Sequence, residues 1–275
     1  MYVNLKEILE IAEIRRCAIP AFNVYNQETV LGVMNAALET RSPVIFQLYS
    51  RLFEGQIAQF LAPMIMEVIH ALPTPAAFHL DHGSGIPAVQ RALRCGVSGV
   101  MIDASTWPLE ENIVQTQAAV KLCQAVGVPV EGELGHIGKA SEEITTEHTC
   151  LDEAVRFANE TQVSALAIMV GTAHGRYKKA PEINIRRICE IHEKVNAALV
   201  LHGGSGVPDD QIQNAIKAGI RKINFGTDLC YAFLDALKRV PGSTVAVDLF
   251  MAEPVQSVQQ FAVSKIALLG SGNYV

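Results

Sequence analysis

Three histidines, each beside a glycine, are the residues of this sequence best suited to hold a metal ion. They are His82, His174 and His202, in the segments DHG, AHG and LHGG. Three imidazole nitrogens suit zinc and leave one position open, from which the ion can polarise a substrate oxygen. A single histidine is more often a hydrogen-bonded structural residue, so the prediction depends on the three meeting at one place.

Acidic residues stand near these histidines in the predicted site. Asp81 precedes His82 and could exchange a proton with a substrate hydroxyl, provided that the strand ends or bends there so that both side chains face the site. Asp103 and Glu133 have two open interpretations, as ligands of a displaced metal or as residues that orient the histidines. His136 stands near them without an assigned role.

Eight short apolar runs must position these residues. They alternate with helical segments, as in βαβ units with parallel strands. The runs cover residues 18–24, 43–49, 76–82, 99–105, 128–135, 165–171, 198–204 and 222–228. We predict an α/β fold with a single (β/α)8 TIM barrel as one domain over residues 1–275, plus an extra C-terminal helix near 255–270. In this fold the active site lies at the carboxyl ends of the strands, which is where the histidines fall.

Two glycine-rich segments predict a phosphate site at the same end of the barrel. HGGSG at 202–206 follows the seventh run, and NFGTD at 224–228 falls at the end of the eighth. The loops after strands seven and eight usually bind phosphate in this fold, through backbone N–H groups and hydroxyls such as those of Ser205 and Thr227.

Eight segments together resemble the class II, metal-dependent ketose-bisphosphate aldolases, which include the fructose- and tagatose-1,6-bisphosphate aldolases. They are PAFNV at 20–24, SPVIFQ at 42–47, HLDHG at 79–83, VMIDAS at 100–105, VEGELGHIG at 130–138, GTAHGRYK at 171–178, LHGGSG at 201–206 and KINFGTDL at 222–229. The resemblance implies a lyase that reversibly cleaves a ketose phosphate to dihydroxyacetone phosphate and an aldehyde.

The resemblance also implies the ligands of the metal. His82, His174 and His202 would bind zinc, which polarises the C2 carbonyl and stabilises the enediolate. Asp103 and Glu133 match positions associated with a second or displaced metal location. A monovalent cation, Na⁺ or K⁺, would accompany the substrate phosphate.

Further roles follow from the same resemblance. Asp81 would move the proton of the C4 hydroxyl, and Asn224 would help to hold the enediolate. The acid that removes a proton from dihydroxyacetone phosphate would be Glu142, or alternatively Glu143, in the long polar segment 135–153, interpreted as a lid. The implied substrate-binding residues are Asn23, Gly175, Gly203, Ser205, Asn224 and Thr227.

The chain departs from the family pattern at several positions. Tyr49 stands where serine is common, Gly138-Lys139 replaces a Gly-Gly pair, and Gly226 replaces an Asn or Asp. A DPR segment expected before the final helix reads Asp248-Leu249-Phe250, so Phe250 replaces an arginine associated with the far phosphate. We therefore expect an acceptor aldehyde other than glyceraldehyde 3-phosphate, without a terminal phosphate.

Two alternatives remain open from the sequence. The chain could be a non-catalytic sugar-phosphate-binding protein or a structural subunit of an active aldolase. A Schiff-base aldolase would need a lysine, for which Lys222 is the obvious candidate, but we expect it to open the eighth strand, far from the mouth of the barrel.

Composition disfavours nucleic acid and a membrane as partners, and the resemblance implies a small phosphorylated sugar. Lys and Arg number 22 against 28 Asp and Glu, a net charge of −6 without a basic run, which disfavours nucleic acid. No apolar stretch reaches the ~18 residues of a membrane span. The acidic helical N-terminus is unlike a signal peptide and the six cysteines show no metal spacing, so we expect a cytoplasmic protein. The family also predicts a homo-oligomer, a dimer or a tetramer.

Overall fold

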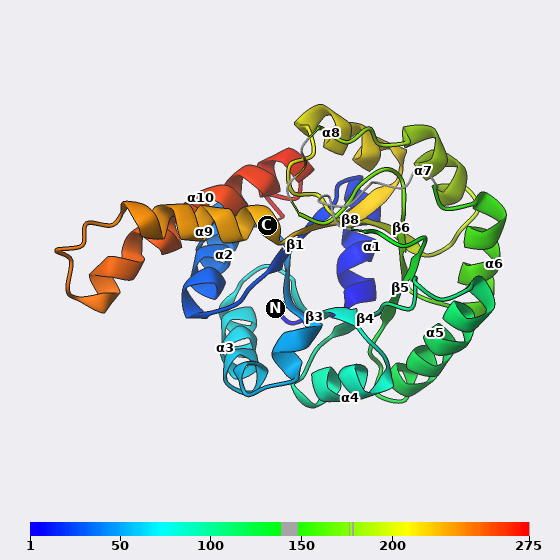
Figure 1. The fold of residues 1–275 in the computed structure, drawn as a ribbon, viewed down its shortest axis with the longest axis horizontal. Helices are drawn as coiled ribbons and strands as arrows, with labels where there is room; N and C mark the ends of the chain where they lie inside the picture. Colours follow the sequence, from blue (N-terminus) through cyan, green and yellow to red (C-terminus); the bar gives the residue numbers. More distant parts are fainter. Residues whose placement is uncertain (139–147, 176, 178, 275) are drawn as a thin grey trace.

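Eight parallel strands close into a barrel in the computed structural model of the protein, and helices surround them (Figure 1). The structure describes residues 1–138, 148–175, 177 and 179–274. The strands are β1 (Ile19–Asn23), β2 (Val44–Tyr49), β3 (Ala76–Gly83), β4 (Gly99–Ile102), β5 (Val130–Leu134), β6 (Ala165–Ile168), β7 (Ala198–Leu201) and β8 (Ile220–Phe225). They pair in sequence order, and β8 returns to β1. The predicted (β/α)8 barrel is confirmed.

The helices follow the alternation expected from the sequence. They are α1 (Leu5–Arg15), α2 (Gln27–Thr40), α3 (Ile57–Ala71), α4 (Ile86–Arg94), α5 (Leu109–Gln124), α6 (Leu151–Thr161), α7 (Ile185–His192), α8 (Asp209–Ala218), α9 (Thr227–Arg239) and α10 (Val247–Leu269), with a 3₁₀ helix η1 (Ser50–Phe53) after β2. Asn4 and Asn26 begin α1 and α2 with capping boxes, in which side chains satisfy backbone N–H groups of the first turn. Within the described residues, no helix is long and apolar enough to cross a bilayer.

Several boundaries differ from the sequence prediction. Strand β8 begins at Ile220, so Lys222 lies inside the strand and does not open it, which corrects the prediction. Residues 227 and 228 belong to α9, because Ser205 Oγ accepts a hydrogen bond from the N–H of Asp228 and so satisfies a donor of its first turn. Helix α10 starts at Val247, well before the predicted start near 255. It continues through Pro254, although proline usually ends or kinks a helix.

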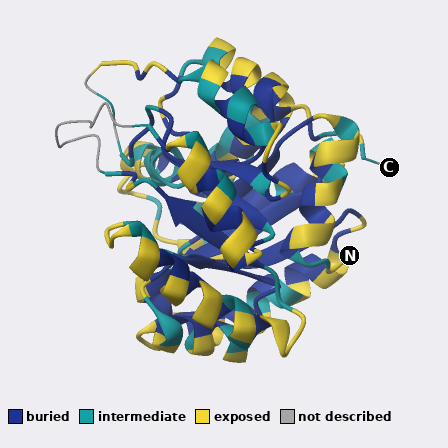
Figure 2. Ribbon diagram, turned by 90° about the vertical axis from the view of Figure 1, so that its right-hand side faces the viewer, coloured by how far each residue is buried: buried dark blue, intermediate teal, exposed yellow. Residues whose placement is uncertain are grey.

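The barrel interior is divided into an apolar end and a polar end. Helix α1 closes the amino-terminal end with Leu5, Ile8 and Leu9, which pack on small and apolar side chains of the strands. A second apolar layer lies between the strands and the outer helices, and Figure 2 shows the strands buried inside an exposed helical surface. Polar side chains therefore concentrate toward the carboxyl ends of the strands.

Helices α9 and α10 form an arm that projects from one side of the barrel, beside α2 (Figure 1). Gly32 in α2 lets α10 come close, because a Cβ on this residue would lie 2.6 Å from Cγ1 of Val258. At the far end of the arm Val245, Val247 and Leu249 are 88%, 71% and 64% exposed. The arm is thus anchored by α2 and ends in an apolar tip.

Candidate active site

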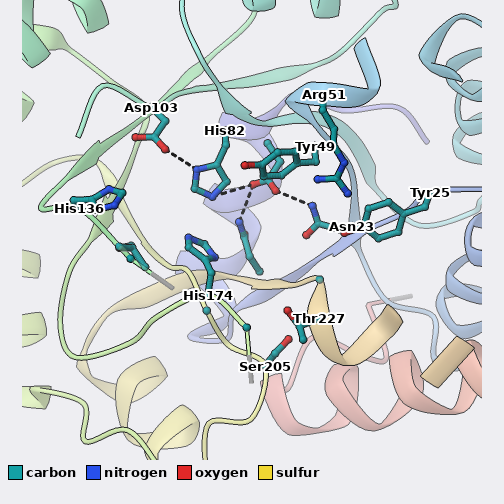
Figure 3. Close-up of a pocket in the computed structure, with 17 residues that line it drawn as sticks. Asn23, Tyr25, Tyr49, Arg51, His82, Asp103, His136, His174, Ser205 and Thr227 are labelled. Atoms are coloured by element: carbon teal, nitrogen blue, oxygen red, sulfur yellow. Dashed lines mark hydrogen bonds and ion pairs between the residues drawn. The ribbon is translucent and has the colours of Figure 1, made fainter. Parts of the chain in front are cut away.

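A cavity of about 470 Å³ opens at the carboxyl ends of the strands (Figure 3). Ten of the residues given a catalytic, substrate-binding or metal-binding role from the sequence line it: Asn23, Asp81, His82, Asp103, His174, Gly175, Gly203, Ser205, Asn224 and Thr227. His202 and Glu133 are fully buried and lie within reach of these residues. Glu142 and Glu143 fall outside the described residues. The structure therefore brings together all the predicted site residues that it describes.

The three histidines meet edge to face in this cavity. The ring of His82 lies 4.8 Å from that of His174 and 5.0 Å from that of His202, centroid to centroid. One nitrogen from each ring lies within 4.8 Å of the others. Among the described residues, His174 Nε2 and His202 Nδ1 are buried without a hydrogen-bond partner. Buried polar atoms are normally paired, so these converging nitrogens fit a divalent metal ion.

A distortion at the end of β3 brings Asp81 and His82 to the same cavity. The register with β4 shifts between Leu80 and Gly83, and His82 adopts a left-handed backbone conformation with φ of 51°. A regular strand would point these neighbours to opposite faces. The bend expected from the sequence is present.

Charge around the histidines favours a cation. Burial opposes protonation of His82, but Asp81 and Asp103 outweigh that effect and raise its pKa to about 10. Burial, helped by the neighbouring rings of His82 and His202, lowers the pKa of His174 to about 3. Burial also lowers the pKa of His202. Two rings are thus neutral near pH 7, and the third lies where carboxylates attract positive charge.

Asp103 and Glu133 form a second possible metal group with His82, again with ligand atoms within 4.8 Å of one another. Asp103 Oδ2 lies 2.8 Å from His82 Nδ1, so it also orients that ring. Ser105 Oγ lies 2.8 Å from Asp103 Oδ1 and 2.9 Å from Glu133 Oε1. Burial and Asp103 raise the pKa of Glu133 to about 8, and in its protonated form Glu133 can donate to the hydroxyl. Both interpretations made from the sequence are compatible with this geometry.

The carboxylate of Asp81 is held by two amides. Asn23 donates to one oxygen at 2.7 Å and Asn224 donates to the other at 3.2 Å. Burial disfavours ionisation, but the surrounding positive charges, that of His82 first, outweigh it and lower the pKa of Asp81. The carboxylate is therefore ionised and fixed in the cavity, ready to accept a proton.

The glycine-rich loops form the opposite side of the cavity. Gly203 has φ of 65°, and a Cβ there would collide with the carbonyl oxygen of Ala173. The hydroxyl of Tyr177 accepts a hydrogen bond from Ala173 N–H and donates one to the carbonyl of Gly203, which ties the two loops together. Thr227 opens α9, whose N-terminus carries partial positive charge. These features suit a phosphate.

Comparison with known proteins identifies the family. The model of the family "fructose-bisphosphate aldolase class-II" matches residues 3–274. The chain belongs to this family. The aldolase resembles solved structures along its whole length: YdjI aldolase from Escherichia coli K12 is 32% identical, with a TM-score of 0.91 over 99% of both chains. A putative fructose-1,6-bisphosphate aldolase from Coccidioides immitis is 25% identical, with a TM-score of 0.90 over 98% of this chain and 97% of that chain.

A third structure shares the fold. Fructose-bisphosphate aldolase from Campylobacter jejuni is 21% identical, with a TM-score of 0.86 over 100% of this chain and 97% of that chain. The family and the first structural match establish the protein as an aldolase, a carbon–carbon lyase. The family is generally metal-dependent, which agrees with the histidine cluster.

A buried charged layer lies beneath the aldolase's histidines and was not predicted from the sequence. Glu131 Oε1 lies 2.9 Å from His202 Nε2, and Oε2 lies 2.9 Å from Lys222 Nζ. Lys222 also donates to Asn224 Oδ1 at 2.8 Å, which turns the Asn224 amide nitrogen toward Asp81. Burial opposes ionisation of Glu131, but Lys222 and the histidines hold its pKa well below the usual range. The sequence offered one indication of this layer, namely that Glu131 and Lys222 are charged residues within otherwise apolar runs.

Two residues on the remaining side of the aldolase's cavity were also missed, Tyr25 and Arg51. Tyr49, noted in the sequence only as a departure from the family, lines the same side, 5.6 Å from the His82 ring. Phe250 lies in the first turn of α10 and does not line this cavity as described. The segment at 248–250, which takes the place of DPR, was expected before the final helix. It lies inside α10, so that expectation is corrected.

Proposed function

We propose that this aldolase reversibly cleaves a ketose phosphate to dihydroxyacetone phosphate and an aldehyde, with zinc as its cofactor. The proposal depends on one observation: the imidazoles of His82, His174 and His202 converge at the cavity that holds Asp81 and Asn224. Nitrogens of His174 and His202 lack a hydrogen-bond partner among the described residues, and His82 lies beside carboxylates. We also propose that residues 1–275 form one domain, since strands from along the whole chain build one barrel.

His82, His174 and His202 would hold the zinc, because their nitrogens converge and zinc favours imidazole ligands. Asp103 and Glu133 would serve a second or displaced metal position. When bound, the ion would polarise the substrate carbonyl and stabilise the negative charge that develops on carbon–carbon cleavage. A monovalent cation, Na⁺ or K⁺, would sit near the phosphate.

Asp81 would accept the proton of the C4 hydroxyl as the carbon–carbon bond breaks, and return it in the condensation. Its lowered pKa and its two amide donors keep it ionised before the reaction. Proton transfer of this kind requires a carboxylate within hydrogen-bond reach of the hydroxyl. The Asn224 amide nitrogen, turned toward the cavity by Lys222, would donate to the enediolate left by cleavage.

The substrate phosphate would bind between the glycine-rich loops and the start of α9. Gly175 and Gly203 allow backbone N–H groups to approach an anion, and Ser205 and Thr227 offer hydroxyls. Asn23 would bind substrate as well as hold Asp81. Glu142 would exchange the proton at C3 of dihydroxyacetone phosphate, with Glu143 as the alternative; both stay predictions from the resemblance, outside the described residues.

Lys222 disfavours a Schiff-base mechanism. Its side-chain nitrogen is completely buried and is engaged by both Glu131 and Asn224, whereas Schiff-base formation requires a free amine facing the substrate. The acceptor is expected to differ from glyceraldehyde 3-phosphate, because Phe250 replaces the arginine of the far phosphate. A comparison of turnover between fructose 1,6-bisphosphate and other ketose 1-phosphates tests this, and equal turnover would contradict it.

His174→Ala tests the proposed metal site. We expect the variant to lose bound zinc and aldol cleavage together, because one of three converging nitrogens is removed. Zinc content is measured by mass spectrometry beside activity, and chelation followed by zinc addition should abolish and restore activity in the wild type. His70→Ala, at an exposed histidine of α3, is the control. An unchanged zinc content in His174→Ala would refute the ligand assignment, and trapping of a lysine by borohydride would refute the mechanism.

A further inference from the structure

Arg51 occupies the side of the cavity away from the glycine-rich loops. It belongs to η1, directly after β2, and lines the cavity. Its guanidinium lies 4.8 Å from the ring centroid of Tyr49 and 5.8 Å from that of Tyr25. Figure 3 shows the guanidinium between the two tyrosines, with Ser205 and Thr227 on the opposite side of the pocket.

The contacts of Arg51 hold its guanidinium in place but leave its donors available. Cation–π contacts to the two tyrosines are its interactions with the described part of the chain, and neither ring accepts an ordinary hydrogen bond through its face. Other arginines differ: Arg156 pairs with Glu110, and Arg221 pairs with Glu13. The N–H groups of Arg51 are therefore positioned to bind an acceptor brought by a ligand.

The distribution of charge in the cavity indicates which part of a substrate Arg51 could bind. Within residues 1–138, 148–175, 177 and 179–274, Arg51 is the only lysine or arginine that lines the cavity, whereas Asp81 and Asp103 are on its lining. Tyr49 bridges the short distance from His82 to Arg51. A substrate with its phosphate at the glycine-rich loops and its reacting carbons at the histidines would extend its other end toward Arg51.

We propose that Arg51, flanked by Tyr25 and Tyr49, binds an anionic group at the end of the acceptor aldehyde remote from its carbonyl carbon. The proposal rests on the proposed function and names its substrate class: ketose 1-phosphates whose opposite end is anionic, with a carboxylate favoured over a phosphate because Phe250 replaces the arginine of the far phosphate. The planar guanidinium matches both groups through two parallel hydrogen bonds, and cation–π contacts keep it oriented.

Condensation of dihydroxyacetone phosphate with matched aldehydes tests this role. The carboxylate pair is succinic semialdehyde and its methyl ester, and the phosphate pair is glyceraldehyde 3-phosphate and glyceraldehyde. Zinc-loaded wild type is compared with Arg51→Met, which keeps an unbranched side chain without charge, and with Arg94→Met, at an exposed arginine of α4, as the control.

In Arg51→Met we expect kcat/KM for at least one anionic aldehyde to fall about tenfold to a hundredfold, the effect of losing a charge-assisted contact. The matched neutral aldehyde should stay within about twofold, which also shows that the variant is folded. Arg51→Lys should lie between the two, because it keeps the charge without the planar pair of donors. The pair of aldehydes whose turnover depends on Arg51 identifies the bound group as a carboxylate or a phosphate.

Three results would overturn the proposal. One is an equal loss on charged and neutral aldehydes in Arg51→Met, which would indicate a general structural role. Another is a wild type that does not prefer either anionic aldehyde over its neutral counterpart. If the wild type condenses none of the four aldehydes while zinc is bound, the proposed function itself is refuted, and this inference with it.

Discussion

Lys222 is the residue on which the orientation of the Asn224 amide, and so its contact with Asp81, depends. It contacts Glu131 beneath the histidines and the carbonyl oxygen of the Asn224 side chain, whose nitrogen then faces Asp81. The ammonium can only donate, so it excludes the flipped orientation of the amide. Lys222 thus links His202, through Glu131, to the carboxylate of Asp81, through Asn224.

Substituting Lys222 should damage stability and activity together. In Lys222→Met the carboxylate of Glu131 stays buried without its cation, so we expect a loss of roughly 3–5 kcal/mol in the free energy of unfolding. Urea unfolding of the zinc-free protein measures it. The double variant Glu131→Gln/Lys222→Met should recover part of that loss, because no unpaired charge remains. Equal stability of wild type and Lys222→Met would argue against an ion pair of this importance.

The histidines and Asp81 could be predicted because polar residues at glycine-flanked strand ends are conspicuous among apolar runs. Glu131 and Lys222 occupy the same kind of run, but nothing local indicates that residues 91 positions apart meet inside a barrel. Arg51 could not be assigned either, since an arginine after a strand is usually solvated. Its position beside Tyr25 and Tyr49 depends on how two neighbouring connections pack.

Helix α10 depends on α2 for its position, and the contact leaves no room for a larger residue. Gly32 faces Val258 so closely that a Cβ would lie 2.6 Å from its Cγ1 and 3.0 Å from the carbonyl oxygen of Val255. A helix between the first two strands could be predicted from the alternation of strands and helices, but nothing in the sequence indicates that Gly32 must be small. Its role appears only once α10 is present.

Gly32→Ala should therefore destabilise the protein although alanine is the better helix former. Overpacking costs about 1–3 kcal/mol, against a gain of about 1 kcal/mol from helix propensity. Thermal and urea unfolding provide the measurement. Gly55→Ala, between η1 and α3, is the control for adding a Cβ without a clash, since nothing lies within 4 Å of a Cβ at that position. A stabilised Gly32→Ala variant would show that the helices separate without cost.

The molecule as a whole is a closed barrel with one projecting arm. The order of strands and helices in the barrel could be predicted from their periodicity. The arm could not, because Pro254 suggests a helix boundary in the sequence although it lies inside α10. Exposed apolar residues gather at the end of the arm. Large exposed apolar side chains close together in the chain often mark an interface, which supports the prediction of a homo-oligomer.

The oligomer should depend on the apolar tip. We expect the wild type to have a mass in light scattering of at least twice the 29.8 kDa of one chain. Replacing Val245, Val247 and Leu249 together by glutamate should shift it toward the monomer, because a second copy would have to bury the new charges. Phe60→Glu, at a residue of α3 that is 76% exposed, should leave the mass unchanged. A monomeric wild type would contradict the prediction.

The histidines come from β3 and from the connections after β6 and β7, whereas Tyr49 ends β2 and Arg51 lies in η1, which follows it directly. If the proposed roles hold, bond-breaking chemistry and recognition of the acceptor's far end are encoded in separate stretches of the gene. Mutations in the codons for residues 49–51 would then alter which aldehyde is accepted without rebuilding the reaction centre. Such a division lets related enzymes diverge in substrate preference by small steps, and it makes this short connection the natural target for directed evolution.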